Sequence, residues 1–141
     1  MFLFCLSFTS CLFAQQVESI GTLVIKIINF KNDQGQVKVA LFDSKEGFPD
    51  KREKAIATVK SKIKNNQTDV KFDSLNYGVY AVGLFHDENL NDKFDSNWLK
   101  IPKEGYGASN DAKGKFGPPS FNAAKFELKS DTLKIVIKVY Y

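Results

Sequence analysis

The sequence predicts an all-β fold, an antiparallel β-sandwich of about seven strands that is immunoglobulin-like or transthyretin-like. Short stretches rich in β-branched and aromatic residues recur along the chain, and turn-forming residues separate them about every eight to twelve residues. No stretch has the period of 3.6 residues that marks an amphipathic helix. Together, these features favour two packed antiparallel sheets.

The composition fits one globular domain. Of the 141 residues, 43% are hydrophobic and 26% are charged, which allows a single well-buried core. The net charge is +4, but lysines alternate with acidic residues and no run of five basic residues occurs. This distribution argues against a nucleic-acid partner. We expect one domain over residues 15–141.

Residues 1–14 form an uncharged, apolar segment that ends in Ala14 before two glutamines. This pattern is typical of a secretory signal peptide cleaved after Ala14, and it predicts a secreted or periplasmic protein. No basic flank precedes the segment, so we expect the signal to begin upstream of Met1. The segment is shorter than the roughly 20 residues that span a bilayer, and we expect no transmembrane span in the mature chain.

Both cysteines lie in this segment, at Cys5 and Cys11. Cleavage after Ala14 would therefore leave a mature chain without thiol or disulfide chemistry. The alternative is lipid attachment at Cys11, because the preceding residues loosely match a bacterial lipoprotein signal. Phe8, at the position where leucine is usual, counts against that alternative.

Residues 21–30 predict the first strand, which is apolar on both faces for much of its length and is expected to be buried. Residues 32–35, Asn-Asp-Gln-Gly, have turn chemistry. Residues 36–42 then alternate, with Val37 and Val39 on one face. We expect the two strands to form a hairpin.

Residues 43–54 are rich in charge and predict a surface connection, with Phe48 turned inward as an anchor. Residues 55–64 alternate with period two and predict a strand whose lysine face is solvated, which discourages edge-to-edge pairing. After a turn at 65–67, residues 68–72 alternate again.

Residues 75–80 turn into residues 81–85, which we expect to form the central and most apolar strand of the domain. Near the end of the chain, a short strand at 126–128 precedes a turn at Ser130-Asp131. The closing strand, 133–141, alternates strongly and places Leu133, Ile135, Ile137, Val139 and Tyr141 on one face.

Several motifs follow one another in the second half of the chain. They are Leu75-x-x-Gly78-x-Tyr80, Phe85-His86-Asp87-x-Asn89-x-Asn91, Gly105-Tyr106-Gly107-x-Ser109-Asn110 and Lys115-Phe116-Gly117-Pro118-Pro119-Ser120-Phe121. Their order resembles a family of bacterial secreted proteins, domain of unknown function 2141, over roughly residues 21–141. The resemblance implies an extracytoplasmic β-sandwich and transfers no activity. The first motif is also similar to a turn in transthyretin-like and collagen-adhesin stalk-type sandwiches, a likeness of folding alone.

A dense set of short oxygen-bearing side chains follows the central strand, in the loop 86–97. Asp87, Asn89 and Asn91 stand at i, i+2 and i+4, with Lys93 at i+6 and Asp95 at i+8. An EF-hand loop supplies calcium ligands at these offsets, with a backbone carbonyl at the position of Lys93. Calcium is therefore the one candidate cofactor, with these five residues as candidate ligands.

Two departures weaken the calcium pattern. Asp92 replaces the sixth-position glycine, and Trp98 stands where the bidentate glutamate belongs. With only two carboxylates in the ligand set, we expect weak binding, with a dissociation constant of roughly 0.1 to 1 mM. The alternative is a turn in which Asp and Asn side chains cap their own backbone without metal.

His86 is the only histidine, and the sequence leaves it either a structural hydrogen-bonding role or a role as ligand or base. Residues 105–124 are long for a loop and rich in glycine and proline. Their aromatic side chains either cover one end of the sandwich or form a contact surface, and we hypothesise that residues 109–111 lend oxygens to the loop 86–97. The candidate ligand- or partner-binding residues are His86, Tyr106, Ser109, Asn110, Phe116 and Phe121.

We expect a noncatalytic binding or accessory module whose partner is an extracytoplasmic protein, peptide or glycan. The alternative is a small hydrolytic enzyme that uses His86 and Asp87, with Ser109 or Ser120 as nucleophile. No Gly-x-Ser-x-Gly motif supports that chemistry. A third alternative is a structural envelope protein without a small ligand.

Overall fold

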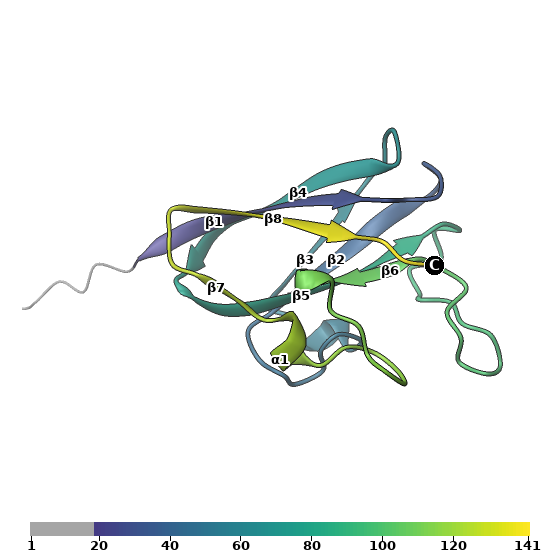
Figure 1. The fold of residues 1–141 in the computed structure, drawn as a ribbon. Coiled ribbons are helices and arrows are strands. Elements are labelled where there is room, and N and C mark those ends of the chain that lie inside the picture. Colours follow the sequence, from purple (N-terminus) through teal and green to yellow (C-terminus); the bar gives the residue numbers. More distant parts are fainter. Residues whose placement is uncertain (1–18) are drawn as a thin grey trace, which may run out of the picture.

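The computed structural model describes residues 19–141 and shows two β-sheets packed on each other (Figure 1). One sheet has the strand order β4 (Gln67–Asn76), β1 (Ile20–Ile28), β8 (Thr132–Lys138). The other has the order β3 (Ala57–Ser61), β2 (Gln36–Phe42), β5 (Gly78–Asp87), β6 (Tyr106–Ala108), and β7 (Phe126–Leu128) also pairs with β5. The predicted all-β sandwich is confirmed. The predicted signal peptide, Cys5 and Cys11 lie outside the described residues.

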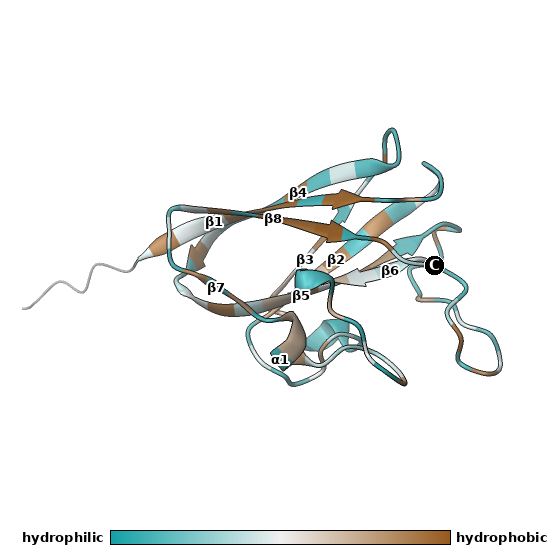
Figure 2. Ribbon diagram, in the orientation of Figure 1, coloured by the Kyte–Doolittle hydropathy of each residue, from teal (hydrophilic) through white to brown (hydrophobic). Residues whose placement is uncertain are grey.

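The core lies between the sheets, where β1, β4 and β8 alternate inward apolar and outward polar side chains, while β2 and β5 are buried on both faces. In β1, Leu23, Ile25 and Ile27 are fully buried while Lys26 is exposed, so this strand is not buried on both faces as predicted. The inward residues of β2, β4, β5 and β8 complete one cluster. Figure 2 shows hydrophobic colouring along much of β1 and β8 and hydrophilic colouring of many loops.

The predicted hairpin of the first two strands is wrong. β1 lies between β4 and β8, whereas β2 lies between β3 and β5, so residues 29–35 cross from one sheet to the other. Asn29 and Gly35 have φ values of 72° and 69°, in the left-handed region. A Cβ on Gly35 would lie 2.1 Å from the carbonyl oxygen of Asp87. The turn-forming residues at 32–35 therefore allow the chain to pass from one sheet to the other while Gly35 lies close to the backbone of Asp87.

The first and last strands pair in parallel, which is a second difference from the antiparallel prediction. Leu23 lies opposite Leu133 and Ile25 opposite Ile135. Every other pair of named strands in residues 19–141 is antiparallel. The closing strand alternates as predicted, and Ile137 and Val139 are fully buried.

Strand β5 is central, as predicted, because it pairs with β2, β6 and β7. It is buried from Tyr80 to its last residue, Asp87. The chain therefore enters the loop 88–105 directly from the interior. This placement carries His86 and Asp87 inside the protein, beneath the loop that follows them.

The segment 105–124 is not one long loop. It contains β6, the 3₁₀ helix η2 (Ser109–Asp111) and the four-residue helix α1 (Phe121–Ala124), so only residues 112–120 are irregular. The hydroxyl of Ser120 accepts the N–H of Ala123 and caps α1.

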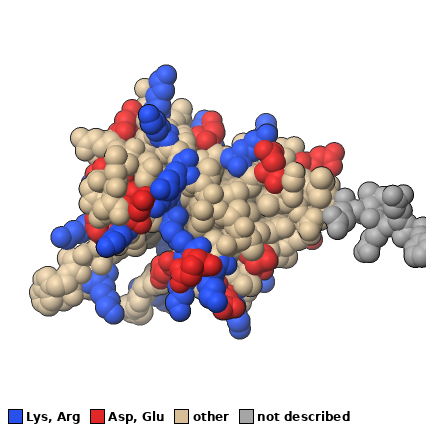
Figure 3. All heavy atoms as spheres, turned by 180° about the vertical axis from the view of Figure 1, so that it is seen from behind, with Lys and Arg blue, Asp and Glu red and all other residues tan. Residues whose placement is uncertain are grey.

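Phe48 packs edge-to-face against Phe42 and Phe121, with ring centroids 5.3 and 5.8 Å away, which confirms the predicted inward anchor. The same connection contains the 3₁₀ helix η1 (Arg52–Lys54). Between residues 19 and 141, no helix has the length and apolar character needed to cross a membrane. On the face seen in Figure 3, basic and acidic side chains are interspersed.

Candidate functional site

His86 lies at the inner end of the site and is completely buried. Its Nε2 is 2.6 Å from the carbonyl oxygen of Gln34, and its Nδ1 is 2.7 Å from the hydroxyl of Tyr141. Because the carbonyl can only accept, Nε2 carries the proton and Nδ1 accepts from Tyr141. Tyr141 in turn accepts the N–H of Lys31, 3.1 Å away. Both ring nitrogens are thus engaged in holding residues 31–34 against β5.

Asp87 is also completely buried, and its carboxylate accepts three hydrogen bonds. Oδ1 accepts the N–H of Asn91 at 3.1 Å, and Oδ2 accepts the N–H of Asp92 at 3.1 Å and the side-chain amide of Gln36 at 3.0 Å. A carboxylate in this position fixes the first turn of the loop through its backbone amides. Asp87 therefore fixes the backbone of residues 91 and 92 from its buried position at the end of β5.

Arg52 supplies a positive charge on the same side of the sheet. Its guanidinium carbon lies 4.5 Å from the ring centroid of Phe85, and Nη2 donates to the carbonyl oxygen of Lys38 at 2.9 Å. Burial lowers the pKa of Arg52 to about 10, and the charge of Asp87 acts in the opposite direction. Arg52 stays protonated at neutral pH and offsets part of the charge of Asp87.

Glu104 holds the other end of the loop. It is buried, and its two carboxylate oxygens accept the N–H of Glu88 at 3.1 Å and the N–H of Asp95 at 3.0 Å. Burial raises the pKa of Glu104, and the nearby charges of Asp95 and Asp87 add to this effect, while the two backbone hydrogen bonds oppose it. Sequence reasoning missed Glu104, for which the only signal is its position directly before the Gly105 motif.

The side chains of Asn89, Asn91 and Asp95 come together above this base. Oδ2 of Asp95 accepts the side-chain amides of Asn89 at 2.8 Å and Asn91 at 2.9 Å. Oδ1 of Asn89 accepts the N–H of Asn91, and Oδ1 of Asn91 accepts the N–H of Lys93. The spacing at i, i+2, i+4 and i+8 thus folds into one cluster, to which Asp87 is joined through the amide of Asn91.

Asp92 adopts the left-handed conformation that the sixth position of an EF-hand loop requires. Its φ is 64°, so the turn forms although the residue is not glycine. Its carboxylate lies 2.6 Å from the ammonium of Lys38 and 3.0 Å from that of Lys60. Hydrogen bonds from Lys38 and Lys60 lower the pKa of Asp92 to about 2. Asp92 therefore ties the loop to strands β2 and β3 through its ion pairs with Lys38 and Lys60.

The candidate ligands fit a calcium ion, but only two of them, Asp87 and Asp95, carry a negative charge. A carbonyl or carboxylate oxygen that accepts one hydrogen bond keeps a second lone pair, so the side-chain oxygens of Asn89 and Asn91 can still coordinate. The amide nitrogens of both residues face Asp95, so metal binding requires that these contacts rearrange. No three His, Cys, Asp or Glu side chains in residues 19–141 are placed to hold a metal.

A cleft of about 460 Å³ opens beside this cluster. Glu88 at its edge forms an ion pair with Lys31, with 2.7 Å between Nζ and Oε1. Partial burial acts to raise the pKa of Glu88, but hydrogen bonds from Lys31 and Asn32 outweigh it and the pKa is lowered. The cleft is lined by Lys31, Glu88, Asn89, Asp95, Ser96, Lys103 and Glu104.

Ser109 and Asn110 make contacts elsewhere. The buried hydroxyl of Ser109 accepts the N–H of Val82 at 2.9 Å and donates to the carbonyl of Ala124 at 2.6 Å. The side chain of Asn110 donates to two carbonyl groups at the end of α1, and Asp111 accepts the N–H of Lys138. In the described chain, none of these hydrogen bonds reaches residues 86–97. The three side chains join β5, α1 and β8, which is a structural role.

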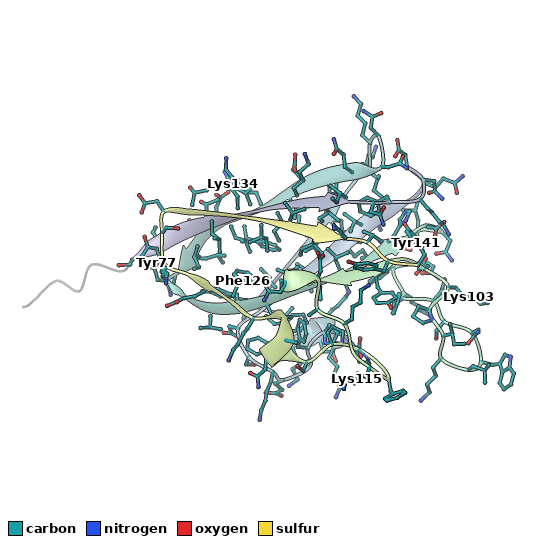
Figure 4. The ribbon with its side chains drawn as sticks, viewed as in Figure 1. Tyr77, Lys103, Lys115, Phe126, Lys134 and Tyr141 are labelled. Atoms are coloured by element: carbon teal, nitrogen blue, oxygen red, sulfur yellow. The ribbon has the colours of Figure 1, made fainter. Side chains whose placement is uncertain are left out.

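The three candidate aromatic residues do not form one surface. Phe121 packs on Phe48, whereas Tyr106 lies 6.2 Å from the ring of Phe94, and Phe116 is fully exposed on the loop 112–120. Figure 4 labels Lys103 and Lys115, which mark two separate loops. Phe94 also contacts Phe85, at 5.4 Å between centroids, and so anchors the middle of the loop 88–105.

The fold and the site define a small all-β sandwich that holds one long polar loop over the end of its central strand. Residues 25–136 match the model of a family described as an uncharacterized protein conserved in bacteria (DUF2141). The chain belongs to this family. Comparisons with curated proteins and with solved structures found no match.

Proposed function

We propose that the protein is a noncatalytic, extracytoplasmic binding or accessory module whose recognition surface is the loop 88–104. The observation that carries this proposal is the use of two buried carboxylates, Asp87 and Glu104, to hold backbone amides of that loop. Burying a charge costs free energy that apolar packing would not cost. Such an arrangement is useful where one defined loop shape matters, as it does in recognition of a protein, peptide or glycan.

A weak calcium site in the same loop is part of the proposal. Asp87, Asn89, Asn91 and Asp95 would supply side-chain oxygens, and Lys93 would supply its backbone carbonyl. Calcium would neutralise the like charges that raise the pKa of Glu104 and would stiffen the loop. The extracytoplasmic location rests on the apolar segment 1–14, and it fits because extracellular calcium reaches the millimolar range that a weak site needs.

The geometry does not favour the hydrolytic alternative. Both ring nitrogens of His86 are hydrogen-bonded, and the carboxylate of Asp87 accepts three donors. Both side chains are completely buried, so neither can take a proton from a substrate without local opening. Ser109 is likewise buried and engaged at both its donor and its acceptor.

Thermal and urea unfolding with calcium tests this proposal. At about 10 mM calcium, a site with a dissociation constant of 0.1 to 1 mM should add roughly 1.4 to 2.7 kcal/mol to the free energy of unfolding relative to a chelator. Asp95→Asn removes one ligand charge and should abolish most of this gain. Asp92→Asn is the matched control, because it removes the same charge from the same loop but not a ligand.

Magnesium, which prefers a tighter octahedral shell, should stabilise the protein less than calcium does. The calcium part of the proposal is wrong if calcium gives no gain. It is also wrong if Asp95→Asn and Asp92→Asn reduce the gain equally.

A further inference from the structure

The outer part of the loop, residues 95–103, is a narrow hairpin. Lys103 donates its N–H to the carbonyl of Asp95, and Asn97 donates to that of Ile101, each at 2.9 Å. Ser96 pairs with Pro102 in an isolated bridge. The hairpin extends away from the five-stranded sheet (Figure 1), so its tip stands clear of the sandwich.

The tip of this hairpin carries three exposed apolar side chains. Trp98 is 88% exposed, Leu99 is 56% exposed and Ile101 is 55% exposed. Folded proteins rarely leave adjacent large apolar side chains in water unless the surface has a partner. Trp98 is the only tryptophan of the chain, and it is the most exposed of these three side chains.

Four of the five backbone N–H groups of the tip, those of Asn97, Leu99, Lys100 and Ile101, are hydrogen-bonded within it. Oδ1 of Asn97 accepts the N–H of Leu99 and the N–H of Ile101, both at 2.9 Å. Lys100 donates its N–H to the carbonyl of Asn97 and has a φ of 60°. Paired backbone groups lower the cost of moving a turn out of water into an apolar medium.

The one charged residue within the tip Asn97–Ile101 is Lys100, which is cationic. Within residues 19–141, no carboxylate lies within ion-pair distance of Lys93, Lys100 or Lys103. The acidic side chains of the same loop are engaged: Glu88 with Lys31, Asp92 with Lys38 and Lys60, Asp95 with two asparagine amides, and Glu104 with two backbone amides. Hydrogen bonds from neutral amides leave the charges of Asp95 and Glu104 in place, but both residues lie at the base of the hairpin, so the charge nearest its tip is the cationic one of Lys100.

A second loop repeats the combination of an exposed aromatic ring and lysines. Phe116 is fully exposed on residues 112–120, next to Lys115. In Figures 1 and 4 this loop and the hairpin both extend beyond the five-stranded sheet, on the side away from the three-stranded sheet.

We propose that the tip Asn97–Ile101 inserts into the headgroup region of an anionic phospholipid bilayer. Tryptophan is favoured at that depth, and lysines beside it contact lipid phosphates. A stable protein partner needs about 800 Å² from each side, which a projecting turn of five residues does not offer. The proposal goes beyond the binding function of the loop, because it concerns the tip and requires neither calcium nor a protein partner.

The intrinsic fluorescence of Trp98 tests this insertion directly in the wild-type protein. With a chelator present to remove calcium, titration with vesicles of phosphatidylglycerol and phosphatidylethanolamine should shift the emission maximum of Trp98 to shorter wavelength. The protein should also sediment with these vesicles. Phosphatidylcholine vesicles should bind far more weakly, and added salt should release the protein from the anionic vesicles.

Variants at the tip separate the apolar and charged contributions. Trp98→Ser should weaken sedimentation with anionic vesicles about tenfold or more. Lys100→Ser combined with Lys103→Ser should weaken it about 25-fold, because each lysine near an anionic surface contributes about fivefold. The matched controls are Val136→Ser, at an exposed aliphatic residue of β8, and Lys26→Ser combined with Lys134→Ser, which removes the same charge from the three-stranded sheet.

Absence of binding to anionic vesicles by the folded wild-type protein would overturn the inference and leave the calcium proposal untouched. Equal losses in the tip variants and the controls would also overturn it, since the binding would then follow net charge alone. Size-exclusion chromatography provides a third test. If the wild type is a dimer and Trp98→Ser is a monomer, the tip binds a second copy of the chain and not lipid, and the inference is overturned.

Discussion

Two long connections leave the five-stranded sheet, and they are held down in opposite ways. Residues 43–56 are anchored by Phe48, whose ring packs between Phe42 and Phe121. Residues 88–105 are anchored by Asp87 and Glu104, whose carboxylates accept backbone amides. Apolar packing holds a segment down without direction, whereas hydrogen bonds fix particular amides in place. The polar anchors therefore specify the shape of a loop, and the aromatic anchor mainly secures its attachment.

Removal of the polar anchor should give the largest effect. Asp87→Ala removes an acceptor from the amide of Asn91 and the side chain of Gln36 and leaves the amide of Asp92 with none, and we expect a loss of about 3 kcal/mol in the free energy of unfolding. Urea denaturation measures the loss, and hydrogen exchange should quicken at the amides of residues 91 and 92. A loss below about 1 kcal/mol would mean that water replaces Asp87 without cost, and that the carboxylate is no anchor.

Removal of the aromatic anchor should give a smaller effect. Phe48 is half-buried, so we expect Phe48→Ala to cost about 2 kcal/mol, below the range for a fully buried ring. Phe48→Leu should recover much of that loss, because an apolar anchor needs volume more than direction. Hydrogen exchange should quicken in residues 43–56 and stay unchanged at residues 91 and 92. Faster exchange in both connections would end the distinction between the two anchors.

The ion pairs of Asp92 should give the smallest effect, since its carboxylate is exposed. The pKa of Asp92 is about 2 in the folded protein and about 3.9 in an unfolded chain. A lowered pKa means that the stabilisation is present above about pH 4 and is lost as the pH falls toward 2. Melting temperatures of the wild type and Asp92→Asn should differ at pH 5 and converge near pH 2. A difference that persists at pH 2 would contradict this assignment.

The fold could be predicted from the sequence because alternation in residues 55–64 and 133–139 indicates which face of each strand is buried, although residues 36–42 are buried on both faces. The partners of the strands could not be predicted equally well. Turn residues at 32–35 fit a hairpin as well as a crossing between sheets, and the parallel pairing of β1 with β8 joins segments about 110 residues apart. Contacts at that separation leave no local pattern.

The same limit applies to the site. The spacing of Asn89, Asn91 and Asp95 is local, and these side chains form one hydrogen-bonded cluster, while their predicted role as calcium ligands stays a prediction. Glu104 reaches amides 9 and 16 residues before it, so its role depends on the hairpin that folds between them. The burial of His86 depends on Gln34 and Tyr141, which lie more than 50 residues away on either side.

The parallel pairing of the first and last strands also determines how the domain would respond to tension. Thr22–Ile28 and Thr132–Lys138 run side by side over seven residue pairs. A force that pulls the two ends of the described chain in opposite directions therefore acts along these strands. In this geometry the hydrogen bonds of the ladder share the load as a group in shear, and they cannot be unzipped one after another from a free end.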